Sequence, residues 1–214
     1  MMDRIFAIGD IHGCLDKLKS LIARVPIDGD RDTLVFIGDY IDRGPDSKEV
    51  VECVLDLRRQ INRVICLMGN HEDMLLNYVL HHKDGAMYLS NGGEATAASY
   101  GYRHTLRGQT IDIPLHHMEF FTTLLPYYET EEFIFVHAGL RPGIPLREQS
   151  THDMLWIRHE FMLSDWNFGK TVVFGHTPRD VPILEADKIG IDTGAVYGGN
   201  LTCIELPERI IYQA

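Results

Sequence analysis

Short polar segments whose side chains could do chemistry follow several apolar runs of the sequence. Residues 38–44 (GDYIDRG) come directly after the apolar residues 33–37. Two carboxylates and an arginine are costly to place beside a buried strand unless something offsets their desolvation. A metal ion for Asp39, a histidine for Asp42 and an anion for Arg43 would do that. These partners must come from elsewhere in the chain or from a ligand.

Four other apolar runs end in the same way, at residues 8, 68, 136 and 174. Each is followed by side chains that can bind a metal ion or move a proton. These side chains are Asp10 and His12, Asn70 and His71, His137, and His176. Chance is a poor explanation for five such strand ends in one chain. We expect them to form one site, because ligands bind at the carboxyl ends of the strands in open α/β sheets.

Helical periodicity links the first three runs. Apolar residues recur at helical spacing over 15–25, 50–57 and 74–80. The order β-α-β-α-β-α predicts parallel strands joined by right-handed crossovers. The fold class expected from this order is therefore α/β.

The second half of the chain is less regular. We expect a second sheet from residues 127–136 and 171–174, and short antiparallel strands between 182 and 212. The polar residues 101–110 are expected to form a loop. No linker or internal repeat interrupts the sequence, so residues 1–214 are predicted to form a single domain.

Composition narrows the classes of partner. The 31 acidic residues outnumber the 20 basic ones, which argues against binding to a nucleic-acid backbone. No apolar run approaches the roughly 18 residues of a membrane span, and we expect neither a membrane partner nor a secretory signal. The cysteines are scattered, so we expect no disulfide framework, and a reducing cytoplasm is the predicted location. The oligomeric state does not follow from the sequence.

The candidate ligands are oxygen and imidazole nitrogen atoms without a thiolate. This donor set suits manganese, iron or zinc. Two carboxylates, three imidazoles and one amide are too many for one tetrahedral ion, and they suit two ions about 3.5–4 Å apart that share a carboxylate. The predicted cofactors are therefore two divalent metal ions, with Mn²⁺ preferred and Fe or Zn as alternatives.

The motifs resemble those of a known enzyme superfamily. They are G-D-x-H-G (9–13), G-D-x-x-D-R-G (38–44), G-N-H-E (69–72), H-A-G (137–139) and G-H-T (175–177). Together they resemble the calcineurin-like metallophosphoesterases, and more narrowly the PPP-type serine/threonine protein phosphatases in their short bacterial and phage-lambda-like form. The resemblance implies a four-layer α/β/β/α sandwich with two mixed β-sheets.

The same resemblance implies a role for each ligand. Asp39 would bridge the two metals, and a hydroxide shared by the metals would attack the phosphate directly. The remaining ligands would be Asp10 and His12 at one metal, and Asn70, His137 and His176 at the other.

Other side chains would act on the substrate. Arg43 and Arg158 would contact phosphate oxygens through planar, bidentate hydrogen bonds. His71, held as imidazolium by Asp42, would be a general acid. Asn70 would also face the substrate, and Tyr197 would border its groove by likeness to the family, although a packing role for Tyr197 is equally open.

The leading functional prediction is a phosphoprotein phosphatase that acts on phosphoserine and phosphothreonine, with phosphotyrosine as a further substrate. Its partner would be a phosphorylated protein or peptide. One alternative is a symmetrical dinucleoside tetraphosphate hydrolase, which the acidic Asp42 disfavours as we understand the family pattern. Another is a non-catalytic interaction module with this fold, which the complete ligand set disfavours.

Two histidine pairs lie outside these motifs. His81-His82 and His116-His117 fall in predicted helices away from the strand ends. We expect them to be at the surface or partly packed.

Overall fold

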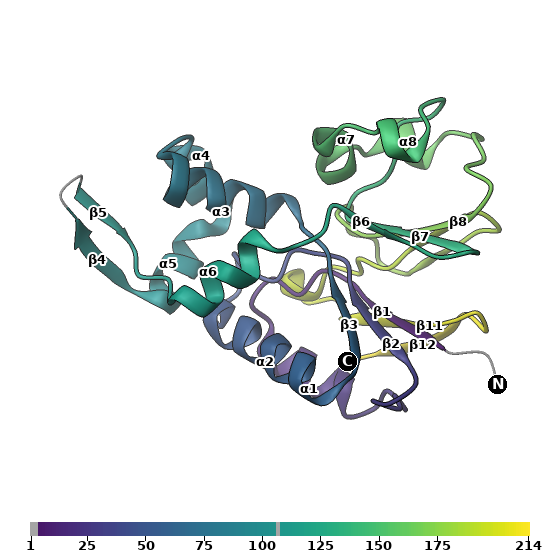
Figure 1. Cartoon of the computed structure of the whole chain (residues 1–214), viewed down its shortest axis with the longest axis horizontal. Helices are drawn as coiled ribbons and strands as arrows, with labels where there is room; N and C mark the ends of the chain where they lie inside the picture. Colours follow the sequence, from purple (N-terminus) through teal and green to yellow (C-terminus); the bar gives the residue numbers. More distant parts are fainter. Residues whose placement is uncertain (1–3, 106–107) are drawn as a thin grey trace.

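A computed structural model describes residues 4–105 and 108–214 of the chain. The expected β-α-β-α-β-α order is present in the first part (Figure 1). Its elements are β1 (Ile5–Ile8), α1 (Leu15–Ile22), β2 (Thr33–Phe36), α2 (Ser47–Gln60), β3 (Arg63–Cys66) and α3 (Asn70–His81). β1, β2 and β3 pair in parallel, as predicted.

Helices dominate the middle of the chain. They are α4 (Gly85–Tyr88), α5 (Glu94–Tyr100), α6 (Leu115–Thr122), α7 (Thr151–Trp156) and α8 (His159–Met162). Short helical turns also occur at Leu89–Gly93, Leu146–Glu148 and Ala195–Tyr197. The remaining strands are β4 (Tyr102–Thr105), β5 (Gly108–Ile111), β6 (Tyr127–Glu129), β7 (Phe133–Val136), β8 (Thr171–Phe174), β9 (Ile183–Leu184), β10 (Lys188–Gly190), β11 (Thr202–Leu206) and β12 (Ile210–Gln213).

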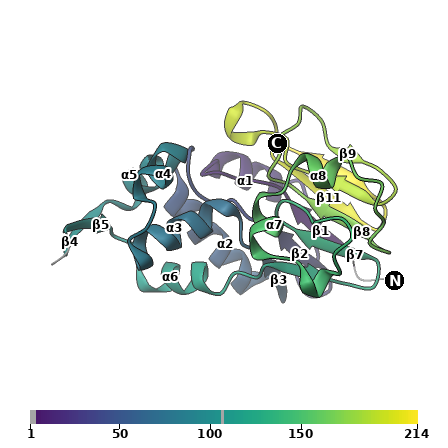
Figure 2. The same ribbon diagram turned by 90° about the horizontal axis from the view of Figure 1, so that it is seen from above.

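Two five-stranded mixed sheets form the centre of the molecule. Their strand orders are β12-β11-β1-β2-β3 and β6-β7-β8-β10-β9. In Figure 1, α1 and α2 lie below the first sheet, and α7 and α8 lie above the second. Figure 2 shows the same elements from above. The predicted α/β/β/α order of layers is confirmed.

Alternation along the strands explains these layers. Phe6 and Ile8 of β1 pack toward the helices, whereas Ala7 between them packs between the two sheets. In β7, Phe133 and Phe135 enter the core between the sheets, and Ile134 packs toward α7 and α8. Strands with both faces buried read as continuous apolar runs, which is why their ends could be located in the sequence.

Two expectations about the second half are wrong. Residues 101–110 are not a loop, because β4 and β5 pair as an antiparallel hairpin that projects from the molecule (Figure 1). Tyr102, Arg103 and His104 of β4 are exposed, so this strand lacks the alternation of buried apolar and exposed polar residues that reveals a strand in a sequence. β10 is also not purely antiparallel, since it pairs in parallel with β8 and antiparallel with β9.

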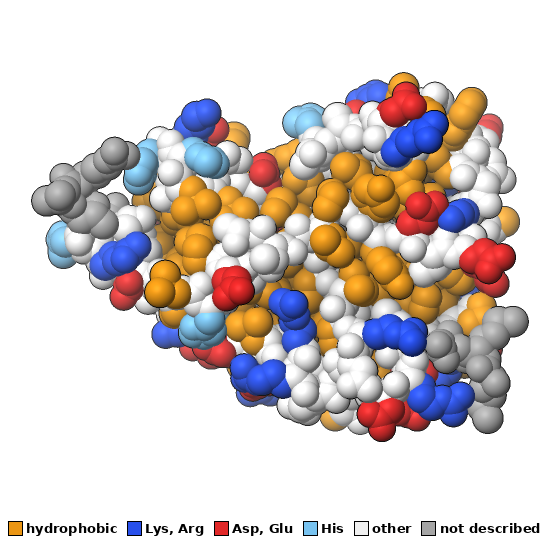
Figure 3. Space-filling model, viewed as in Figure 1, with side chains coloured by type: hydrophobic (Ala, Val, Ile, Leu, Met, Phe, Trp, Pro, Cys, Tyr) orange, Lys and Arg blue, Asp and Glu red, His pale blue; other side chains and the backbone are white. Residues whose placement is uncertain are grey.

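The surface on this side is uneven. Figure 3 shows hydrophobic side chains over the middle of the face, and a hollow in its upper edge between the part with α3 and α4 and the part with α7 and α8. Within residues 4–105 and 108–214, no helix is long and apolar enough to cross a membrane.

Candidate metal centre

The residues singled out at the strand ends lie in sharp backbone turns. Five of the eight described non-glycine residues with positive φ belong to this group. They are His12, Asp39, Asp42, Arg43 and His176, with φ between 47° and 73°. Side chains with a Cβ seldom adopt this conformation, which costs about 1–3 kcal/mol per residue and clusters at functional sites.

Asp39 lies at the centre of the group and is 2% exposed. Its Oδ2 is 3.4 Å from Nε2 of His12, and its Oδ1 is 3.5 Å from Nε2 of His137. Each carboxylate oxygen therefore faces a different imidazole. A carboxylate that bridges two metal ions needs this arrangement.

Backbone carbonyls orient the imidazoles of His12 and His137. Nδ1 of His12 lies 2.8 Å from the oxygen of Ile41, and Nδ1 of His137 lies 2.9 Å from the oxygen of Ile37. A carbonyl only accepts, so each Nδ1 carries the proton and each Nε2 presents a lone pair. Arg43 donates to Nε2 of His12, which agrees with this tautomer.

Two buried polar atoms of the group lack a hydrogen-bond partner. They are Oδ1 of Asp10 and Nε2 of His176. Leaving such an atom unpaired costs about 1–3 kcal/mol, whereas a cation would satisfy both. The other oxygen of Asp10 accepts from the backbone N–H of His176 at 3.1 Å, and so joins the ends of β1 and β8.

The geometry divides the side chains into two sets that share Asp39. Ligand atoms of Asp39, His137 and His176 lie within 4.8 Å of one another, and so do those of His12, Asp39 and His71. Asn70 Oδ1 is 2.9 Å from Nε2 of His137, beside the first set. Asp10 was expected beside His12, yet it is not in the second set, where His71 stands instead. The residues present fit a pair of divalent cations, and their individual roles as ligands stay predictions.

Burial and neighbouring charges set the protonation of the carboxylates. Burial raises the pKa of Asp10, and the charges of Asp192 and Asp39 raise it further. Burial also acts to raise the pKa of Asp39, but the imidazoles of His137, His71 and His12 outweigh it and lower that pKa. Asp39 is thus the carboxylate held in its charged form.

His71 and Asp42 form the predicted dyad. Nδ1 of His71 is 2.7 Å from Oδ2 of Asp42, and both side chains are buried. Oδ1 of Asp42 accepts from Tyr88 at 2.9 Å and from Thr96 at 2.6 Å. Sequence reasoning missed Tyr88 and Thr96, because a hydroxyl in a helix carries no signal of the strand end that it will reach.

Glu72 is a second residue whose role the sequence did not reveal. Its carboxylate accepts from the backbone N–H groups of Asp39 and Tyr40 at 2.9 Å and of Gly69 at 3.0 Å. It therefore fixes the turns after β2 and β3 against each other. Their approach also explains Gly69, where a Cβ would lie 2.1 Å from Oδ1 of Asp39. The G-N-H-E motif contained Glu72, but only the fold shows what it holds.

A cavity of about 160 Å³ adjoins the metal-binding group. Its lining includes Arg43, Arg158, Asp192 and Tyr197. Arg158 donates to the backbone oxygen of His176 and to Thr177 Oγ1, both at 3.2 Å, which aims its guanidinium at this cavity.

Tyr197 and Asp192 occupy different depths of this cavity. Tyr197 is 64% exposed, and the guanidinium of Arg43 lies 5.7 Å from the centroid of its ring. Asp192 is buried, and burial raises its pKa to about 6. The sequence contained Asp192 in Ile191-Asp192-Thr193-Gly194 without assigning it to the site. Tyr197 lies at the rim, where an exposed aromatic ring can contact a ligand.

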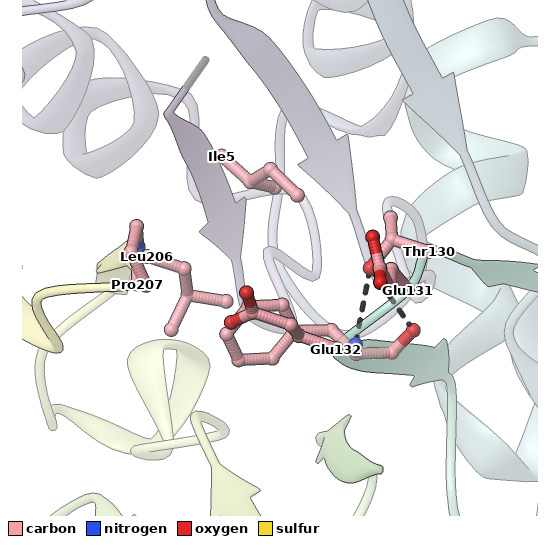
Figure 4. A pocket seen from close by; sticks show the side chains of 7 residues that line it. Ile5, Thr130, Glu131, Glu132, Leu206 and Pro207 are labelled. Atoms are coloured by element: carbon pink, nitrogen blue, oxygen red, sulfur yellow. Dashed lines mark hydrogen bonds between the residues drawn. The ribbon is translucent and has the colours of Figure 1, made fainter. Parts of the chain in front are cut away.

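A more apolar pocket lies away from this site. Figure 4 shows Ile5, Leu206 and Pro207 of the first sheet facing Thr130, Glu131 and Glu132 beside the second. Ile5 and Phe133 begin their strands, so this pocket is at the opposite edge of the sheets from the strand ends that bear the ligands. It contains no histidine or cysteine.

Comparisons with known proteins agree with this geometry. The sequence model of the calcineurin-like phosphoesterase family matches residues 3–205. A curated relative from Bacillus cereus (strain 03BB102), named bis(5′-nucleosyl)-tetraphosphatase PrpE (asymmetrical), is 30% identical over 229 residues. That alignment covers 94% of this chain and 89% of the relative.

Solved structures give the same fold. A crystal structure described as a candidate diadenosine tetraphosphatase matches with a TM-score of 0.77 at 26% identity, covering 100% of this chain and 94% of the other. A cold-active protein-tyrosine phosphatase from a Shewanella species matches with a TM-score of 0.61 at 20% identity, covering 95% of this chain and 76% of the other. The second match is a likeness of fold alone.

The buried imidazoles should make the metal-free protein sensitive to acid. Burial lowers the pKa of His12 to about 3 and of His176 to about 2, from an ordinary value of 6.5. Below pH 6.5 the unfolded chain therefore binds more protons than the folded one, and stability falls as the pH falls. In EDTA, we expect acidification from about pH 7 to about pH 5 to lower the free energy of unfolding of both the wild type and His176→Asn. The decrease should be about 2 kcal/mol smaller in His176→Asn, which lacks one buried imidazole. Urea titrations at both pH values measure this difference. The exposed His82→Asn is the control, and an equal loss in all three proteins would contradict the assignment.

Proposed function

The chain belongs to the calcineurin-like phosphoesterase family, and we propose that it is a metal-dependent hydrolase that cleaves bis(5′-nucleosyl) tetraphosphates asymmetrically. The observation that carries this choice of substrate is the similarity to relatives of that name over nearly the whole chain. The cavity supports it as well. Two guanidinium groups suit a polyphosphate, and the exposed ring of Tyr197 offers a face on which a base can stack.

A phosphoprotein phosphatase of the PPP type is the second candidate. The specific observation in its favour is the dyad of His71 and Asp42. A serine or threonine alkoxide is a poor leaving group that needs a proton, whereas a nucleotide phosphate leaves readily without one. The dyad therefore supports monoester chemistry more directly than anhydride chemistry.

The position of cleavage differs between our sequence-based alternative and the relatives. The alternative was a symmetrical hydrolase, whereas the name of the relatives specifies the asymmetrical reaction. Our reservation about Asp42 concerned symmetrical enzymes alone. An acidic residue at this position does not count against the asymmetrical reaction that we propose.

When bound, two divalent cations lower the pKa of a water molecule and offset the charge of the phosphate. Asp10, His12 and Asp39 would hold one ion, and Asp39, Asn70, His137 and His176 the other. We take Mn²⁺ as the preferred metal, with Fe or Zn as alternatives. The charge of these cations would also offset the local carboxylates, so that the net charge of −11 need not repel a phosphate.

The other side chains would position the substrate and move a proton. Arg43 and Arg158 converge on the cavity from the β2 turn and from the residue before α8, and would hold phosphate oxygens on two sides. Nδ1 of His71 is committed to Asp42, so Nε2 is the atom from which His71 can donate to a leaving oxygen. Tyr88 and Thr96 keep Asp42 fixed, so that it can orient the ring of His71.

Substrate comparison tests the proposed function. We expect the manganese-loaded protein to convert diadenosine tetraphosphate to ATP and AMP with a kcat/KM at least about tenfold above that for a phosphoserine or phosphothreonine peptide. Product analysis by ion-exchange chromatography distinguishes ATP and AMP from two ADP. Faster release of inorganic phosphate from the peptides would support the second candidate instead. Equal production of ADP would support the symmetrical reaction.

The dyad of His71 and Asp42 gives a second prediction, which does not depend on which of the two candidate functions is correct. His71→Asn should lower kcat about 10²–10⁴-fold for a phosphoserine peptide and much less for an aryl phosphate, whose leaving group needs less protonation. Steady-state rates on both substrates measure this difference. The metal content of the variant should equal that of the wild type. Equal losses on the two substrates would contradict the role of His71 as general acid.

A further inference from the structure

We propose that Glu52, His116 and His117 form a third metal site, which binds Zn²⁺ between α2 and α6. Glu52 lies in α2, and the two histidines lie in the first turn of α6. Oε1 of Glu52 is 3.0 Å from Nε2 of His116 and 2.8 Å from Nε2 of His117. These side chains come from the helices outside the sheets, away from the strand ends that carry the predicted dimetal site.

His117 is the residue that points to a ligand. We expected both histidines at the surface or partly packed, but His117 is completely buried. Its Nδ1 lies 2.7 Å from the hydroxyl of Tyr100, which fixes the ring. Its Nε2 is buried without a hydrogen-bond partner, although Glu52 is within 2.8 Å.

The short distance between Nε2 of His117 and Oε1 of Glu52 and the missing hydrogen bond are compatible if both atoms face a metal ion. A hydrogen bond requires the donor, its hydrogen and the acceptor to be nearly in line. Two metal ligands approach each other without that alignment, because both lone pairs point at the ion beside the line that joins them. Nε2 of His117 and Oε1 of Glu52 lie close together without an aligned hydrogen bond, as two ligands of one ion would.

Protonation favours the same arrangement. Burial lowers the pKa of His117, so its imidazole is neutral at neutral pH and offers a lone pair. The hydrogen bond from His116 is the main cause that lowers the pKa of Glu52, whose carboxylate is therefore charged. Metal ligands need these forms, namely a neutral imidazole and an ionised carboxylate, and zinc would replace the proton that Nε2 of His116 now donates to Glu52.

The donor set selects the class of cation. Two imidazoles and one carboxylate are a known zinc set with an open fourth position, whereas Ca²⁺ and Mg²⁺ require mostly oxygen ligands. Zinc bonds of about 2.0 Å in a tetrahedron place the ligand atoms roughly 3.3 Å apart. The present contacts would open by only a few tenths of an ångström. The side chains of Glu52 and His116 are 43% and 56% exposed, which leaves them free to move that far.

Such an ion would join two parts of the fold. α2 covers the first sheet, and α6 precedes the chain segment that enters the second sheet at β6. An ion bound only by the folded chain raises its stability in proportion to the logarithm of ion concentration. Zinc at this site would therefore resist separation of α6 from α2.

Zinc content of the full chain tests the proposal. Metal-free wild type, His116→Asn, Glu52→Gln and the control His82→Asn are each equilibrated with excess Zn²⁺, freed of unbound metal and analysed by mass spectrometry for zinc per chain. We expect the wild type and His82→Asn to hold one zinc more than His116→Asn and Glu52→Gln. We also expect Zn²⁺ to raise the Tm of the first two proteins further than that of the other two.

The comparison does not depend on the proposed activity, since all four proteins keep the strand-end site and no substrate is used. His116 is exposed, so its substitution should leave the fold intact, and circular dichroism checks this. Equal zinc content in all four proteins, with equal shifts in Tm, would overturn the proposal. Glu52 and the histidines would then form an ion pair only.

Discussion

The buried carboxylate of Asp39 is the interaction on which the rest of the site depends. It is 2% exposed and carries a charge, and such burial is prohibitive unless the surroundings offset it. The Nε2 lone pairs of imidazoles from different strand ends face its two oxygens, so divalent cations held between them would offset this charge. The carbonyls of Ile37 and Ile41, in the turn after β2 that carries Asp39, fix two of those rings, so one turn supplies the carboxylate and orients the groups around it.

The positive φ angles follow from the same constraint. Side chains from five strand ends must meet in a region a few ångströms across. Ordinary turns would not direct all of them to it. Strain at His12, Asp39 and His176 is the consequence. Glu72 offsets this strain, because its carboxylate accepts hydrogen bonds from the backbone N–H groups that the sharp turns leave without a backbone partner.

The strand ends could be predicted because buried strands leave continuous apolar runs in the sequence. Asp10, His12, Asn70 and His71 each follow such a run, and the topology then brings them to one edge. Tyr88 and Asp192 could not be placed in the same way. Tyr88 reaches Asp42 from a helix 46 residues further along the chain, and its position depends on how the helices pack. The β4–β5 hairpin was missed for a related reason, since residues 102–104 of β4 are exposed and show no apolar alternation.

The central claim is that Asp39 joins two metal ions, and electron paramagnetic resonance of the manganese-loaded protein tests it most directly. Two Mn²⁺ ions bridged by one carboxylate are magnetically coupled, whereas separated ions give independent signals. Our account predicts a coupled spectrum for the wild type, and a weaker coupling after Asp39→Asn, where only the shared hydroxide would join the ions. A wild-type spectrum of isolated ions, or a coupling that is unchanged in Asp39→Asn, would contradict it.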